Sequence, residues 1–337
     1  MKSPRLRLFR RAALLVGALL AFTRSAPAQG PSEVTVNVFP GSFNWGIYVA
    51  QERGLFEKNG IRVTVQATPG SVAQMTGLSE GKFDIAMTAV DNIVAYVEGQ
   101  GEAPIGPQPE FFAFMGSDTG FLSLVTASDV KAITDLKGRT LSVDALTTGY
   151  AFVLLDILRR SGLGEYTIAK VGGMVQRWNA LHEHKQEGTM LSTPYNIIAK
   201  SEGFTQLATA TKVIGHYQGN VAAARRSWAA ANKGKVIAYI RAYVEAIDWL
   251  YERANRDEAV RILRKNLPQM SQDLAERSYD ELLDPHDGFF RQGRIDMAGL
   301  KTVLELRSRY GKPTKSLDDP MKYYDPSYHA AAMGQQK

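Results

Sequence analysis

The first third of the chain alternates between short strand-like segments and longer helix-like segments. Residues 34–39, 61–67 and 83–87 have the pattern of β-strands, and each is followed by apolar residues at helical spacing. A strand and a helix repeated three times predict a parallel sheet in an α/β domain. Two more strands are expected at 111–115 and 122–126.

A second run of strands and helices fills the middle of the chain. Strands are predicted at 140–143, 168–171, 189–192 and 206–210, and a helix at 175–187 lies among them. One more strand, 220–224, precedes a helical remainder. We therefore expect an α/β protein in which residues 29–116 form the first part of lobe 1, 117–212 form lobe 2, and 213–337 complete lobe 1 with C-terminal helices. Two crossings would then join the lobes at a hinged cleft.

Residues 1–28 are predicted to be a signal peptide. A basic segment precedes an apolar run, Ala12–Phe22, and the small-residue site Ala26-Pro27-Ala28 follows it. The eleven residues of the run are too few to cross a bilayer, which needs about 20. A buried or amphipathic helix would not explain why the basic charge precedes the run. Arg10-Arg11 leaves twin-arginine export open beside the general route. The mature chain is expected in a bacterial periplasm.

Charge and cysteine content narrow the possible functions. The chain has 40 Lys and Arg against 34 Asp and Glu, and the six basic residues of the leader account for the whole excess. The remainder is formally neutral, which removes the basic surface expected of a nucleic-acid or acidic-membrane binder. Cysteine is absent. This excludes disulfides, zinc–thiolate sites, thiol catalysis and a lipid-modified N-terminal cysteine.

Five loops are predicted at the carboxyl ends of strands, where open α/β sheets bind ligands near helix N-termini. They are rich in hydroxyls, glycines and aromatic rings. Capping explains any single hydroxyl best, but five such loops on one side of two sheets indicate a ligand cleft. The candidate ligand-binding residues are Ser42, Phe43, Asn44, Trp45, Gly70, Ser71, Thr88, Asp91, Thr147, Thr148, Gly149, Tyr150, Arg177, Thr193 and Tyr195.

Four of these residues have a second interpretation. Trp45 and Tyr150 could stack on the apolar body of a ligand, or pack partly buried at helix starts. Asp91 could receive an ammonium group, although a capping role fits it better. Arg177 could pair with a carboxylate or sulfonate, or lie solvated on its helix, and the sequence favours neither.

No catalytic or metal-binding motif emerges from the sequence. The chain has no HExxH, GxSxG, P-loop or strand-linked GxGxxG pattern. His182 and His184 lie two residues apart, on different faces of a helix, and no histidine falls in the five loops. We therefore predict no enzyme activity, no cofactor and no metal.

The run GIYVAQERGLFEKNGI, residues 46–61, resembles a signature of type II solute-binding proteins of ABC importers. The resemblance is to the sulfonate/nitrate/taurine-like, thiamine-pyrimidine-synthase-like group. Supporting segments are 70–87, 135–143, 148–163 and 242–252, so the resemblance covers essentially the whole mature chain. It implies a two-lobed periplasmic-binding-protein type II fold with a helical C-terminal region. It also implies lobes that close over a small ligand and then dock on a membrane permease.

By position, the resemblance implies ligand contacts at Ser42, Trp45, Gly70, Ser71, Thr88, Thr148, Gly149 and Tyr195. The sequence departs from the group at residues 188–195, GTMLSTPY, where the group usually has G-x-x-D-A. The departure suggests a rebuilt wall of the cleft, so the ligand cannot be assumed from the group's name.

The expected function is a monomeric periplasmic binding protein that delivers a small organic anion, sulfonate or carboxylate, to an ABC permease. Two alternatives stay open. The ligand could be a neutral pyrimidine precursor of thiamine, held by stacking and a carboxylate such as Asp91. The fold also supports enzymes, which would need a paired acid and base in the cleft.

Overall fold

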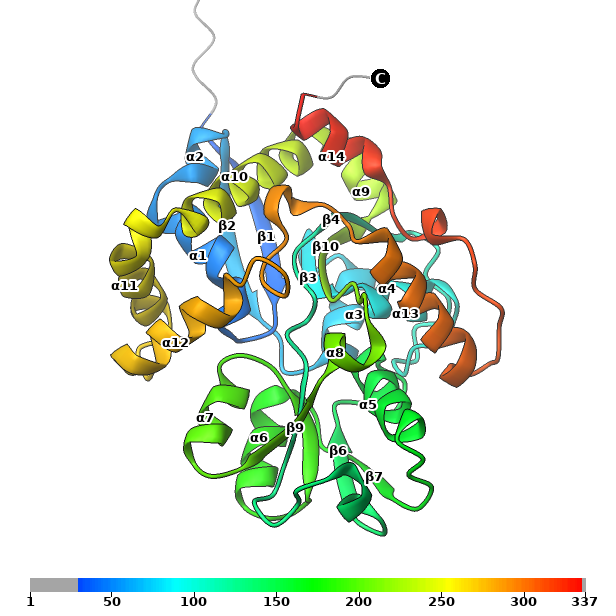
Figure 1. The fold of residues 1–337 in the computed structure, drawn as a ribbon. Helices are drawn as coiled ribbons and strands as arrows, with labels where there is room; N and C mark the ends of the chain where they lie inside the picture. The colour runs from blue at the N-terminus through cyan, green and yellow to red at the C-terminus, as the bar shows by residue number, and fades with distance from the viewer. Residues whose placement is uncertain (1–29, 335–337) are drawn as a thin grey trace, which may run out of the picture. The chain divides into compact units, whose positions relative to one another are not determined.

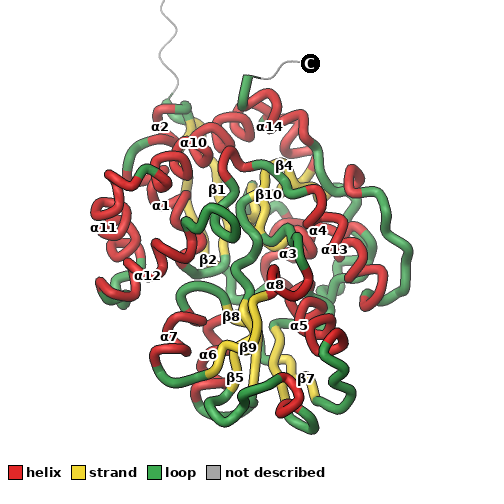
Figure 2. The backbone as a smooth tube through the Cα atoms, viewed as in Figure 1, coloured by secondary structure: helices red, strands yellow, loops and turns green. Residues whose placement is uncertain are grey.

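The computed structural model describes residues 30–334, so the predicted leader lies outside the described part of the chain. Two five-stranded sheets organise it (Figures 1 and 2). The first, in the order β2-β1-β3-β10-β4, contains β1 (Ser32–Val38), β2 (Ile61–Ala67), β3 (Ile85–Ala89), β4 (Phe111–Gly116) and β10 (Asn220–Arg225). The second, in the order β7-β6-β8-β5-β9, contains β5 (Ser123–Thr126), β6 (Thr140–Val143), β7 (Thr167–Lys170), β8 (Gly188–Leu191) and β9 (Thr205–Thr209).

Helices surround both sheets. We name residues 30–116 and 220–334 lobe 1, and residues 123–214 lobe 2. Lobe 1 has α1 (Trp45–Glu52), α2 (Leu55–Lys58), α3 (Ser71–Glu80), α4 (Val90–Val97), α9 (Arg226–Ala231), α10 (Lys233–Tyr251), α11 (Arg256–Asn266), α12 (Gln272–Leu282), α13 (Met297–Tyr310) and α14 (Pro326–Ala332). Lobe 2 has α5 (Gly149–Arg160), α6 (Met174–His182), α7 (Tyr195–Ser201) and α8 (Ala210–Ile214). The mixed α/β fold predicted from the sequence is confirmed.

Strand β10 inserts into the first sheet after the chain has passed through the second. It pairs antiparallel with β3 on one side and with β4 on the other. The chain therefore crosses between the sheets twice, over residues 117–122 and 215–219. The crossings lie against each other: Gly219 N donates to Asp118 O at 2.9 Å. A Cβ atom on Gly219 would come within 2.0 Å of Gly120 N, so only glycine fits here.

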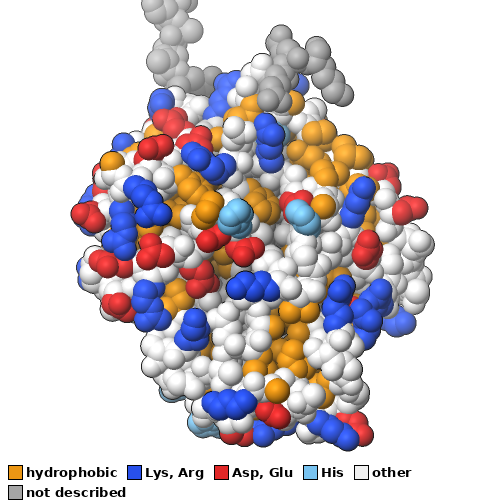
Figure 3. Space-filling model, viewed as in Figure 1, with side chains coloured by type: hydrophobic (Ala, Val, Ile, Leu, Met, Phe, Trp, Pro, Cys, Tyr) orange, Lys and Arg blue, Asp and Glu red, His pale blue; other side chains and the backbone are white. Residues whose placement is uncertain are grey.

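Apolar helix faces cover the sheets as the periodicity predicts. In α10, Ile240, Val244, Ile247 and Leu250 are all buried in the core of lobe 1. Helix α13 packs against α4 of lobe 1 and α5 of lobe 2. Within residues 30–334, no helix is long and apolar enough to cross a membrane. On the face seen in Figure 3, acidic and basic side chains are interspersed and form no field of one sign.

The predicted helix 175–187 is too long at its C-terminal end. Helix α6 stops at His182, and His184 adopts a left-handed conformation with φ of 56°. Lys185 N donates back to Ala180 O at 2.8 Å, which closes the helix as a Schellman turn does. This backbone reversal carries no apolar signal, which is why periodicity missed it.

Candidate functional site

A cavity of about 250 Å³ lies where the loops of the two lobes meet. The residues of lobe 1 in its wall are Phe39, Pro40, Phe43, Thr68, Pro69, Ala89, Asn92 and Asn220. Those of lobe 2 are Asp144, Thr148, Gly149, Tyr150, Gly173, Met174, Val175, Gln176, Arg177 and Ser192. Gly120 comes from the first crossing. Several of these residues directly follow parallel strands, whose carboxyl ends share one edge of a sheet. The cavity therefore lies where strand-end geometry places a ligand.

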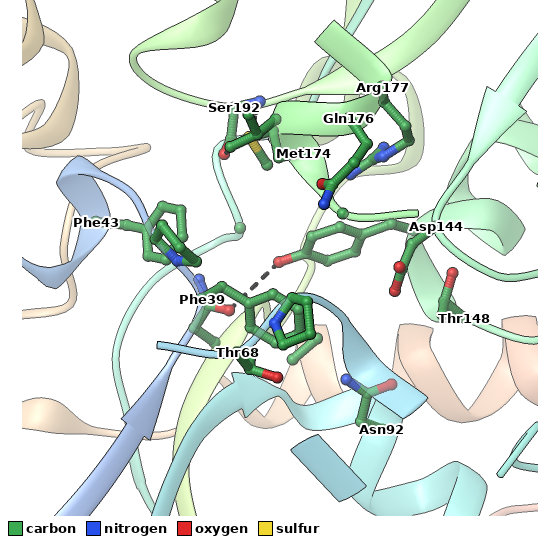
Figure 4. Close-up of a pocket in the computed structure, with 18 of the residues that line it drawn as sticks. Phe39, Phe43, Thr68, Asn92, Asp144, Thr148, Met174, Gln176, Arg177 and Ser192 are labelled. Carbon is green, nitrogen blue, oxygen red and sulfur yellow. Dashed lines mark hydrogen bonds between the residues drawn. The ribbon is translucent and has the colours of Figure 1, made fainter. Parts of the chain in front are cut away.

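The two phenylalanines and the charged side chains occupy different sides of the cavity (Figure 4). Phe39 and Phe43 of lobe 1 lie on one side, and Gln176 and Arg177 of α6 lie across from Phe43. Asp144 completes the wall beside Thr148. Such a wall suits a small molecule with an apolar body and a few polar groups at fixed places.

Arg177 is a buried cation in this wall. Only 3 % of the residue is exposed. Its Nε donates to Gly172 O at 3.1 Å, and its Nη1 donates to Met190 O at 2.6 Å. Burial lowers the pKa of Arg177, but a guanidinium keeps its proton in proteins. Among the described residues no carboxylate forms an ion pair with it, and its Nη2 has no acceptor.

Asp144 is the carboxylate of the wall. It directly follows β6, and its Oδ2 accepts a hydrogen bond of 2.6 Å from Ser71 Oγ at the start of α3. This bond joins the two lobes across the cavity. Its Oδ1 accepts no hydrogen bond from any residue in the described range.

Tyr150 links the cavity to the crossings. Its hydroxyl donates to Asn220 Oδ1 at 3.4 Å, and Asn220 Nδ2 donates to Asp118 Oδ1 at 2.9 Å. Burial raises the pKa of Tyr150 above its ordinary value, so the phenol stays protonated. Burial also raises the pKa of Asp118, against hydrogen bonds from Ser117, Gly120 and Asn220. A chain of hydrogen bonds therefore connects the hydroxyl of Tyr150 to Asp118 in the first crossing.

Five of the candidate residues from the sequence line the cavity: Phe43, Thr148, Gly149, Tyr150 and Arg177. Four other candidates bond elsewhere in the protein through their hydroxyls. Ser42 Oγ donates to Thr193 O at 2.9 Å, and Thr193 Oγ1 donates to Glu281 Oε1 at 2.6 Å. Thr88 Oγ1 accepts from Asn92 Nδ2 at 2.9 Å. These hydroxyls and that of Ser71 are bonded to protein groups, and none of them caps a helix.

Trp45 and Asp91 lie away from the cavity wall. Trp45 is fully buried, its ring N–H donates to Ala259 O at 3.1 Å, and its ring meets Tyr279 edge-on. Both oxygens of Asp91 accept from Arg307, at 2.6 and 2.8 Å. Asp91 therefore neither caps α4, whose N-cap is Ala89, nor lines the cavity.

The remaining candidates take supporting positions. Asn44 Nδ2 donates to Phe39 O at 2.7 Å, the carbonyl of Thr147 accepts from Arg307, and Tyr195 packs in a small apolar cluster of lobe 2. Gly70 precedes α3, and a Cβ there would lie 3.3 Å from Asp144 Oδ1. None of the four lines the cavity.

Sequence reasoning missed Asp144, Gln176, Asn92, Phe39 and Met174. Asp144 carried a usable signal, because it is the first residue after a predicted strand. Met174 and Gln176 lie just before the predicted Arg177 and carried no signal of their own.

Comparisons with known structures find the same fold. The nitrate-binding protein NrtA of Synechocystis PCC 6803 is 13 % identical, with a TM-score of 0.74 over 90 % of this chain and 89 % of its own. The alkanesulfonate-binding protein SsuA of Xanthomonas axonopodis pv. citri, solved with MOPS, is 14 % identical, with a TM-score of 0.67 over 90 % and 99 %. SsuA of Escherichia coli is 17 % identical, with a TM-score of 0.66 over 89 % and 99 %.

No curated protein sequence matches the chain. The family model described as NMT1/THI5 like matches residues 44–256. This range begins one residue before α1, spans all of lobe 2 and ends at the start of α11. The resemblance found in the sequence is thereby confirmed, and the chain belongs to the NMT1/THI5-like family.

Proposed function

We propose that this protein is the extracytoplasmic solute-binding component of an ABC importer. It captures a small organic anion, a sulfonate or a carboxylate, between its lobes and delivers it to a membrane permease. Membership of the family and the names of the similar structures support the binding role. The predicted leader supports export to the periplasm.

The observation that best supports an anionic ligand is the buried guanidinium of Arg177, which forms no ion pair with a described residue. A cation taken out of water costs free energy unless an opposite charge or good hydrogen bonds compensate it. Its Nε and Nη1 are satisfied by carbonyls, and a ligand acid would supply the missing charge at Nη2. A cavity of about 250 Å³ suits a compact acid, because drug-sized ligands occupy about 300–1,000 Å³.

Two helix N-termini add to the positive potential. Thr148 and Gly173 precede α5 and α6, and neither makes a side-chain cap. The first N–H groups of each helix have no acceptor within the helix. Both N-termini line the cavity, so a ligand acid is attracted by their dipoles as well as by Arg177.

A binding role fits the protonation states of the wall. The raised pKa of Tyr150 keeps its phenol protonated, so it cannot accept a proton as a base, and Asp144 has no second carboxylate beside it in the described wall. General acid–base catalysis uses groups that exchange protons near neutral pH. The arrangement supports reversible capture of an acid that leaves unchanged.

The test is a thermal-shift screen of the purified protein, followed by calorimetry. The probes are nitrate, alkanesulfonates, aliphatic and aromatic carboxylates, and a neutral aminopyrimidine. A ligand at a hundred times its Kd adds about 2.7 kcal/mol. With an unfolding entropy of about 0.6 kcal/mol/K for about 300 residues, the melting temperature rises about 4 °C.

The variant Arg177→Gln should weaken the acid about 10- to 150-fold, because hydrogen bonds to charged groups contribute about 1.5–3 kcal/mol. Arg159→Gln is the matched control, since Arg159 is half-exposed in the same lobe. Stabilisation by the neutral pyrimidine alone would refute the anion, and consumption of the compound would refute the binding role.

A further inference from the structure

The cavity wall holds a second charged side chain, of the opposite sign. We propose that the ligand is an acid that also carries a hydrogen-bond donor, an amino or a hydroxyl group, and that Asp144 selects it. The acidic group meets Arg177 and the donor meets Asp144. This inference rests on the proposed function and makes its substrate class more specific.

Asp144 and Arg177 share one edge of the second sheet. Asp144 follows β6, and Arg177 lies in the first turn of α6, which follows β7. Strands β6 and β7 are parallel, with Val143 opposite Lys170 at their carboxyl ends. The fold therefore places both charges beyond the carboxyl ends of the same pair of strands.

The two charges line one cavity without forming a direct ion pair, although the charge of Asp144 raises the pKa of Arg177 against its burial. Arg177 is held back by the carbonyls of Gly172 and Met190, and Asp144 is held by the hydroxyl of Ser71. No ion pair joins Asp144 to Arg177 or to any other described cation. A ligand with one pole of each kind satisfies both residues, whereas a simple acid leaves Asp144 unpaired and is repelled by it.

Oδ1 is the atom of Asp144 that is free for a ligand. Oδ2 is engaged by Ser71 of lobe 1, so the carboxylate is oriented across the cleft when the lobes are together. Gly70 keeps the space near Oδ1 open, because a Cβ atom there would lie 3.3 Å from it. A donor on the ligand would thus bind at a carboxylate that also joins the lobes.

Asp91, the acidic residue selected from the sequence, does not provide this pole. Both of its oxygens are bound by Arg307, and the cavity wall does not include it. The negative pole of the site is therefore Asp144, the residue that directly follows β6.

The experiment compares matched acids by calorimetry on the purified full protein. The pairs are 4-hydroxybenzoate and 4-aminobenzoate against benzoate, and 2-hydroxyethanesulfonate against ethanesulfonate. We expect at least one substituted acid to bind tenfold or more tighter than its parent. In Asp144→Asn and Asp144→Ala this ratio should fall to about threefold or less, while the parent acid binds as well as before or better.

Glu183→Gln is the control, because Glu183 is an exposed carboxylate just after α6 and outside the cavity. The ratio should stay unchanged in it. Equal binding of parent and substituted acids would overturn the inference and leave the proposed function standing. A ratio that survives both Asp144 variants would overturn the assignment to Asp144. Binding of a neutral aminopyrimidine, with no binding of any acid, would refute both this inference and the proposed anion.

Discussion

Arg307 and Asp91 form an ion pair that is sealed inside the protein, and replacing Arg307 by methionine tests how the fold depends on it. The exposed fractions of the two side chains are 0 % and 1 %. The contact is bidentate, with distances of 2.6 and 2.8 Å. The guanidinium also lies 4.7 Å from the ring centre of Phe152 and donates to the carbonyl of Thr147. Arg307 therefore connects α13 to Asp91 of lobe 1 and to Phe152 of lobe 2.

Arg307→Met removes the cation and keeps most of the side-chain volume. The remaining carboxylate of Asp91 is buried without a charge partner, which costs about 3–5 kcal/mol in comparable pairs. With the unfolding entropy of about 0.6 kcal/mol/K, the melting temperature should fall about 5–8 °C. The double variant Asp91→Leu/Arg307→Met should recover most of this loss, because no buried charge remains unpaired.

The assay is thermal unfolding of the ligand-free protein at neutral pH, with Arg309→Met as the control on the same helix. Arg309 is 48 % exposed, and its partner Asp156 keeps contacts with Arg159 and Arg160. Because the buried Asp156 keeps two arginine partners, losing the half-exposed Arg309 should cost only about 0–1 kcal/mol, and the control should lose less than about 2 °C. An equal loss in Arg307→Met and Arg309→Met would refute the reasoning from burial.

Three further changes probe closure and the C-terminal region. Gly149→Ala should weaken ligand binding at least tenfold in calorimetry, because its methyl group would lie 2.3 Å from the carboxyl carbon of Asp91. Unchanged affinity would contradict this prediction. Burial opposes ionisation of Glu98, but hydrogen bonds from Lys322 and two neighbouring residues outweigh it and lower its pKa from 4.5 to about 2. The resulting stability, about 3 kcal/mol, is present above pH 4.5 and is lost as the pH falls towards 2, so Glu98→Gln should flatten the pH dependence of the melting temperature in that window. Glu281→Ala removes an acceptor that lobe 1 offers to Thr193 of lobe 2; affinity should fall several-fold while the melting temperature of the ligand-free protein stays within about 2 °C, and a larger drop in that temperature would assign the contact to folding.

The regular elements follow closely from local patterns in the sequence. The alternating segment 61–67 is β2 to the residue, and the segment 34–39 overlaps β1 almost completely. Half-buried strands must place side chains alternately on two faces, so their sequences carry that period. The end of α6 is different, because it depends on the backbone conformation of His184 rather than on a period.

The loops of the site were predictable, but the side chains within them mostly were not. The rule about carboxyl ends is topological and needs only the order of strands. The direction of a side chain depends on distant contacts instead. Trp45 turns into the core against Tyr279, and Asp91 meets Arg307, 216 residues further along the chain. No local sequence pattern predicts either of these contacts.

Most of the hydroxyl groups selected from the sequence do not line the cavity, for a chemical reason. A serine or threonine can satisfy its hydrogen bonds inside the protein, as Ser42 does with Thr193. A charged group in a cavity wall is harder to satisfy, because carbonyls and hydroxyls leave its charge uncompensated. Arg177 and Asp144 form no ion pair with any described residue, and each is therefore more informative about a ligand than the hydroxyls of the five loops. The chemistry of the ligand is therefore better inferred from the charges that the fold leaves unpaired than from the residue types that its loops contain.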